Sequence, residues 1–164
     1  MKFPTVGRRT AACVLGVAAL ALAAAGCGAR APLLVWEGTG PPGARSADAA
    51  AAELATVAPG VAAGAWGASA DATFQLLRAS VAEEPHVHDH HDLTVVLLRG
   101  RGAVIVAGRR YDLQAGDVLH VGRGRVHHFH PAGGEAALAL AIYTPRLEGP
   151  DRRPAPARSP GGDD

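Results

Sequence analysis

The sequence almost lacks lysine and contains no asparagine. Lys2 is the only lysine among 164 residues, and it lies in the segment that we expect to be removed on export. The rest of the chain then has no amine for Schiff-base chemistry and no ammonium group for a phosphate-binding loop. Enzyme classes that depend on either group are excluded.

An excess of either charge is also missing. The chain has 16 basic and 15 acidic side chains, a formal net charge of +1, and loss of Lys2, Arg8 and Arg9 would bring it to about −2. Dedicated nucleic-acid binders normally carry a strongly basic face. We therefore expect no nucleic-acid partner.

Cysteine is scarce as well, with two residues in the chain. Cys13 lies inside an apolar run near the N-terminus, and Cys27 lies at the end of that run. No internal disulfide and no catalytic thiol is therefore expected in the folded part.

The N-terminal segment has the three-part layout of an export signal. Basic residues precede an apolar run over residues 11–25, which ends at Gly26-Cys27. The run is shorter than the roughly 20 residues that span a bilayer, so we predict a signal peptide over residues 1–26. Its end resembles the bacterial lipoprotein signal, which implies that Cys27 is lipidated and becomes the mature N-terminus. The resemblance implies a membrane-anchored lipoprotein on the periplasmic or extracytoplasmic side of a bacterial cell envelope.

Composition divides the remaining chain into three parts. Residues 27–64 are rich in Ala, Gly and Pro, and we expect a flexible tether with one short helix that begins after Ser46 as N-cap and stops at Pro59-Gly60. Residues 65–146 are expected to form the folded domain. Residues 147–164 carry many prolines and few apolar side chains, which predicts a disordered tail.

The central part contains short apolar runs separated by glycine-containing turns, and it shows no helical periodicity. Such a pattern predicts an all-β barrel or sandwich. The runs cover residues 73–82, 93–98, 103–107, 110–113, 117–121, 126–130 and 136–143.

Histidine is concentrated, because all eight histidines lie between His86 and His130. His86 and His88 are two residues apart at a strand end, so their imidazoles share a face. His127, after a tight glycine turn, is the best third ligand. Three imidazoles that leave coordination positions open indicate a catalytic type of site for a divalent transition metal, namely Zn²⁺, Fe²⁺, Mn²⁺ or Ni²⁺.

These segments resemble a known family. Residues 86–100 are similar to the first cupin motif and residues 116–127 to the second. The resemblance covers about residues 73–144 and implies a double-stranded β-helix, or jelly-roll barrel, with a metal or small ligand in its mouth. It also implies metal binding by His86, His88 and His127. The usual glutamate ligand is missing, because Leu93 stands at its position.

Other side chains could complete the metal site. Asp92 would serve if a bulge rotated it inward, and His91 is a further possibility. For His120 a ligand, a substrate contact and a buried structural role are left open. His90, His91, His128 and His130 are interpreted as exposed or supporting residues, with a shallow secondary metal site as the alternative.

The functional hypothesis is an envelope-anchored cupin that binds a divalent metal and a small molecule. The dominance of Val, Leu, Ala and Phe in the runs predicts a small apolar pocket. Metal-dependent dioxygenase or isomerase chemistry is one form of this hypothesis. A non-catalytic metal or small-ligand binding protein or sensor is the alternative, and a β-domain without metal is a third. Expected partners are the small-molecule ligand, the membrane and, as one option, a second copy in a homodimer.

Overall fold

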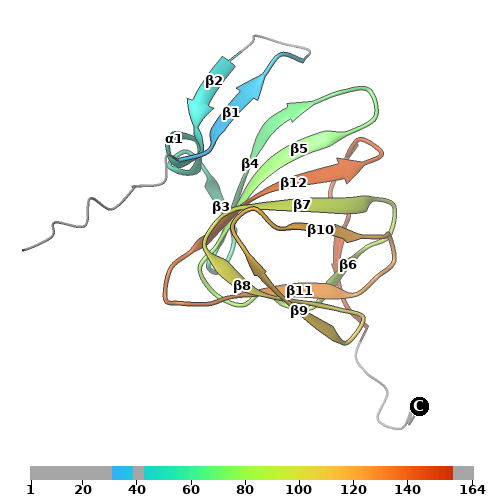
Figure 1. Cartoon of the computed structure of the whole chain (residues 1–164). Coiled ribbons are helices and arrows are strands. Elements are labelled where there is room, and N and C mark those ends of the chain that lie inside the picture. The colour runs from blue at the N-terminus through green and yellow to red at the C-terminus, as the bar shows by residue number, and fades with distance from the viewer. Residues whose placement is uncertain (1–30, 39–42, 157–164) are drawn as a thin grey trace, which may run out of the picture.

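Two large antiparallel sheets face each other across a common core, and a third sheet of two strands lies outside them (Figure 1). This computed structural model describes residues 31–38 and 43–156. The predicted signal peptide, Cys27 and residues 157–164 lie outside the described residues. Within the described part, no helix has the length and apolar character needed to cross a membrane.

The first sheet has six strands in the order β10-β7-β12-β5-β4-β3. They are β3 (Ala55–Ala58), β4 (Val61–Ala68), β5 (Thr73–Ala79), β7 (Asp92–Arg99), β10 (Val118–Val121) and β12 (Ala137–Thr144). The second sheet has five strands in the order β13-β6-β11-β8-β9. They are β6 (His86–His88), β8 (Arg101–Val106), β9 (Arg109–Gln114), β11 (His127–Pro131) and β13 (Arg152–Pro154).

The all-β prediction is confirmed, and each of the seven predicted runs is a strand. Turn chemistry explains their close spacing. Between β8 and β9, for example, Ala107 and Gly108 have φ of 48° and 82°, which is the two-residue turn that suits the twist of a hairpin.

Alternation along the strands separates an inner from an outer face. On β5, Leu77 lines a cavity between the sheets, whereas its neighbour Leu76 packs outside against the N-terminal segment. Because side chains alternate with period two, both faces of this sheet can be apolar only if each is covered. The inner face is covered by the second sheet.

The outer face is covered by the helix α1 (Ala47–Ala51), next to the hairpin of β1 (Leu33–Trp36) and β2 (Gly43–Ser46) (Figure 1). Ala47, Ala50 and Ala51 are buried against Leu76 and Leu138, and these small side chains let the helix approach closely. The predicted N-cap is present, since the amide of Ala49 donates to the hydroxyl oxygen of Ser46 at 3.2 Å.

The sheet starts earlier than the predicted domain boundary. Residues 55–64, expected in the tether, lie in β3 and β4, and β4 pairs with β5 along its length. Glycines in this segment serve packing: a Cβ at Gly67 would come within 2.8 Å of the Trp36 ring, and one at Gly64 would meet Leu54 at the same distance. Small residues therefore mark close contact here and not flexibility.

The predicted tail also contains a strand. β13 pairs with β6, with Arg152 opposite His88 and Pro154 opposite His86. The expectation of disorder from residue 147 onward is therefore incorrect for residues 152–154. A strand at a sheet edge needs only backbone pairing on one side, so its composition can be polar and proline-containing.

Candidate metal centre and adjoining cavity

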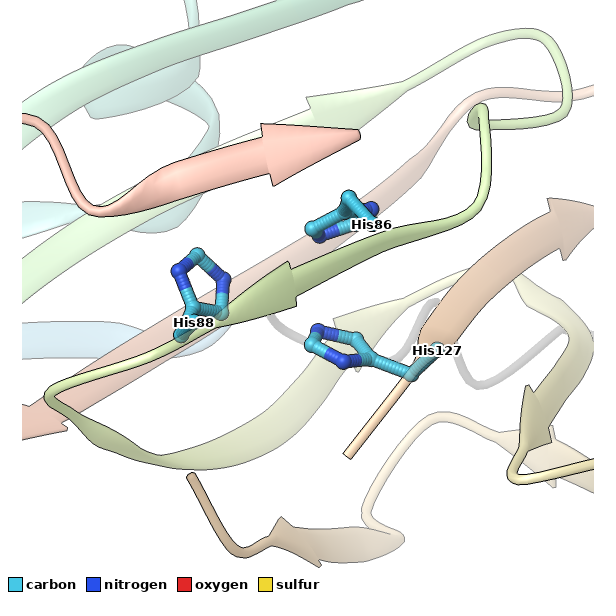
Figure 2. Close-up of side chains that lie close together, drawn as sticks. All are labelled: His86, His88 and His127. Atoms are coloured by element: carbon cyan, nitrogen blue, oxygen red, sulfur yellow. The ribbon is translucent and has the colours of Figure 1, made fainter. Parts of the chain in front are cut away.

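Three histidines from two neighbouring strands converge between the sheets. His86 and His88 come from β6, and His127 of β11 lies opposite His86 in the register. One ring nitrogen from each lies within 4.8 Å of the others, and the three rings surround a common space (Figure 2). All three residues are buried, with exposures of 4%, 6% and 4%.

Backbone carbonyls orient two of these rings. His86 donates from Nδ1 to the carbonyl oxygen of Glu84, and His127 donates from Nδ1 to that of Arg125, each at 2.9 Å. A carbonyl only accepts, so both rings carry the proton on Nδ1 and present a lone pair at Nε2. This is the support that metal-binding histidines usually have.

Two of the cluster's nitrogens have no hydrogen-bond partner within the described part of the chain. They are Nε2 of His127 and Nδ1 of His88, and both are buried. An unpartnered buried nitrogen costs about 1–3 kcal/mol in a folded protein. A metal ion bound between the rings would satisfy both nitrogens, so the donor set fits a metal.

The electrostatics also favour neutral imidazoles. Burial lowers the pKa of His86 to about 3 and that of His88 to about 4, with repulsion from His127 as a further cause in both. Burial likewise lowers the pKa of His127. The rings are therefore neutral at neutral pH, and their lone pairs are available for a cation.

The side chains considered as additional ligands lie elsewhere. Asp92 accepts hydrogen bonds from the backbone N–H and the guanidinium of Arg123, each at 2.9 Å, and this pairing lowers its pKa to about 2. His91 is 2.5 Å from the carboxylate of Asp151. His120 is exposed, with Nδ1 3.0 Å from the hydroxyl of Thr94.

Strand parity explains the placement of Asp92. Leu93 is 5% exposed and lies in the wall of the cavity, so its neighbour Asp92 points the other way, and no bulge rotates it inward. The position of the usual cupin glutamate is thus an apolar part of the barrel wall.

A cavity of about 80 Å³ lies between the sheets, with His127 in its wall. Its other lining residues are apolar with one exception, Glu83. The apolar ones include Leu77, Leu93, Leu97, Leu119 and Phe129. The predicted small apolar pocket is therefore present, and it borders the histidine cluster.

Glu83 was missed in the sequence, where it is one of two glutamates before Pro85. It lies between β5 and β6, and it pairs with β11: its amide donates to the carbonyl of Phe129 at 2.9 Å, and its Oε2 accepts from the amide of Phe129 at 3.1 Å. Burial raises the pKa of this carboxyl, although Arg152 and the Phe129 hydrogen bond act in the opposite direction.

A second carboxylate missed in the sequence holds the loop after β6. Asp151, just before β13, accepts from the amides of Asp89 and His90 at 3.3 and 3.2 Å and pairs with His91. Its side chain is only 6% exposed. This carboxylate joins the C-terminal segment to the loop that follows the two β6 histidines.

Comparison with known proteins agrees with this architecture. Residues 74–143 match the family model of the cupin domain. An uncharacterized protein of Aquifex aeolicus is 36% identical over 76 residues, which is 46% of this chain and 62% of that protein. The match therefore spans less than two thirds of that relative. Together with the fold, these matches support membership of the cupin superfamily.

Solved structures show the same double-stranded β-helix. A protein with this domain from Klebsiella pneumoniae superposes with a TM-score of 0.57 at 20% identity, over 69% of this chain and 96% of that one. KdgF from a Halomonas species gives 0.54 at 20% identity, over 58% and 88%. The nucleoside dehydratase Pac13 of Streptomyces gives 0.52 at 14% identity, over 58% and 78%. At these identities the likeness concerns the fold.

Proposed function

We propose that this protein is a metal-dependent cupin that binds an oxygen-bearing small molecule in its barrel. The observation that carries the proposal is a pair of buried nitrogens, on His88 and His127, that have no hydrogen-bond partner among the described residues. His127 also lines the apolar cavity. His86, His88 and His127 would hold the metal. A divalent cation there would supply Lewis-acid polarisation of a ligand oxygen.

The missing glutamate affects the charge of the site. With three neutral imidazoles and Leu93 in place of a carboxylate, the positive charge of a divalent ion is not reduced by its protein ligands. Such a site favours ligands that present an anionic or strongly polarised oxygen. Zn²⁺, Fe²⁺, Mn²⁺ and Ni²⁺ all accept nitrogen ligands of this kind.

Isomerase or dioxygenase chemistry is the catalytic form of the proposal. Proteins of the same fold include one named as a nucleoside dehydratase, which illustrates that the barrel can support catalysis. A non-catalytic metal-binding role is favoured by one feature, the pair of His128 and His130, whose ring centroids are 4.8 Å apart outside the cluster.

Metal content of the untagged protein tests the proposal. Purified protein should contain about one divalent metal ion per chain by elemental analysis. Single His86→Ala, His88→Ala and His127→Ala variants should each lose most of it, because each removes one of three ligands. Equal losses in His128→Ala and His130→Ala would instead indicate binding at the outer pair.

We further propose anchoring of the protein in a bacterial envelope through Cys27. The support is the sequence pattern ending at Gly26-Cys27. Mass spectrometry of the native protein should show a diacylglycerol-modified Cys27, and Cys27→Ala should leave an unprocessed precursor. An unmodified, soluble mature protein would contradict the proposal.

A further inference from the structure

The cavity contains one acidic side chain in an otherwise apolar wall. Apart from His127, Glu83 is the single titratable residue among those that line it. Two hydrogen bonds with Phe129 fix Glu83, one through its backbone and one through Oε2. The carboxyl group is therefore held in position before any ligand arrives, which is the preorganisation that proton-transfer groups require.

The Glu83 carboxyl group does not belong to the cluster of three histidines. Its link to the cluster is the cavity itself, because His127, one of the three histidines, lines the same cavity as Glu83. The three nitrogens that lie within 4.8 Å of one another belong to histidines alone. Glu83 and His127 thus line one cavity, with Glu83 outside the histidine cluster.

We propose that Glu83 is the acid–base catalytic residue of this barrel and that the substrate is a small aliphatic α-hydroxycarbonyl compound. This inference rests on the proposed metal-dependent function. A cavity of about 80 Å³ is smaller than an engineered cavity of about 150 Å³ that accepts benzene. It therefore suits a short carbon chain, with its oxygens directed towards the histidines.

The step is a proton transfer that needs no oxidant or reductant. The Glu83 carboxylate takes the proton from the carbon next to the carbonyl group. The electron pair of that C–H bond forms a C=C bond, and the carbonyl π pair moves onto oxygen to give an enediolate. Within the enediolate, the hydroxyl proton passes to the neighbouring anionic oxygen. The C=C pair then takes the proton back from Glu83 at the former carbonyl carbon while the deprotonated oxygen re-forms a C=O bond, which yields the isomer. Return of the proton to its original carbon, before the hydroxyl proton moves, regenerates the substrate.

Deuterium incorporation tests this step without knowledge of the natural substrate. The probes are hydroxyacetone and 3-hydroxy-2-butanone, incubated in D₂O with metal-loaded protein and followed by ¹H NMR. Wild-type protein should replace C–H by C–D faster than the same concentration of free metal. Glu83→Gln, which keeps an acceptor for the amide of Phe129, should lose at least about 100-fold, the usual contribution of general acid–base catalysis. Glu135→Gln, at an exposed glutamate, should exchange like the wild type.

A second measurement concerns the carboxyl group itself in metal-free protein. With ¹³C-labelled glutamate, the carboxyl resonance that disappears in Glu83→Gln should titrate above the ordinary range of a glutamate. A titration within the ordinary range would show a solvated side chain and would overturn the proposal.

The outcomes separate this inference from the proposed function. Metal-loaded wild-type protein that does not accelerate exchange, or exchange that survives in Glu83→Gln, overturns the role of Glu83 while leaving metal binding intact. Protein that holds no metal at its histidines refutes the proposed function instead. Metal content is measured in every sample, so the two failures are distinguishable.

Discussion

Acidification should destabilise the metal-free protein through its buried histidines. In the unfolded chain these side chains titrate near their ordinary pKa of about 6.5. In the folded protein, burial lowers the pKa of His86 to about 3 and of His88 to about 4. Between these limits the unfolded state binds more protons than the folded state, so the free energy of unfolding falls as the pH falls.

The magnitude follows from the two shifts. Between about pH 7 and pH 4, linkage predicts that His86 and His88 each remove roughly 3 kcal/mol from the stability of the metal-free protein. The stabilisation is fully present above the unfolded pKa and is lost as the pH falls towards the folded values. A typical domain has only about 5–15 kcal/mol in total, so the effect is large.

Urea unfolding in the presence of a chelator measures this effect, with tryptophan fluorescence as the signal. The unfolding midpoint should decrease steadily below about pH 6.5. His88→Gln should reduce the slope, whereas His120→Gln, which removes an exposed imidazole outside the cluster, should not. An unfolding free energy that is constant down to pH 4 would show that the histidines are not buried as neutral rings, and the reasoning would be refuted.

Three further predictions concern single positions. Leu93→Glu should lower the melting temperature of the metal-free protein, since it buries a carboxylate, but it should raise the affinity for metal. A lower melting temperature both with and without metal would place this side chain away from the site. Asp151→Asn should cost about 1–3 kcal/mol in urea unfolding because it weakens charge-assisted bonds to the β6–β7 loop, and an unchanged midpoint would count against that role. Ser46→Ala should cost about 1 kcal/mol by loss of the helix cap, and rescue by Ser46→Asp would confirm the mechanism.

The sequence predicts the strands of the barrel well, because alternation and glycine turns are local signals. It predicts the N-terminal strands poorly. In β4, Ala and Gly replace the usual alternating large side chains, and the reason is the close packing of Trp36 on Gly67, a contact between residues distant in sequence. β13 has no alternating apolar pattern that would predict a strand. Its position depends on backbone pairing with β6, which leaves no signal in the sequence.

The same distinction holds at the site. The His86-x-His88 spacing and the second motif were sufficient to predict which three histidines come together. The positions of the Asp92 and His91 side chains are not predictable from the sequence, because each depends on a partner that is distant in the chain. Asp92 pairs with Arg123, and His91 pairs with Asp151. Glu83 gave no signal, since only the fold reveals that its side chain meets the cavity.

The pairing of β13 with β6 has a consequence for the order in which the protein matures. β6 and β11 precede Asp151 and β13 in the chain and are therefore synthesised before them. A chain still emerging from the ribosome or a translocation channel can form the barrel's hairpins, but the loop after β6 lacks its anchoring carboxylate until residue 151 is released. Metal loading should therefore follow the emergence of residues 151–154 and the pairing of β13 with β6.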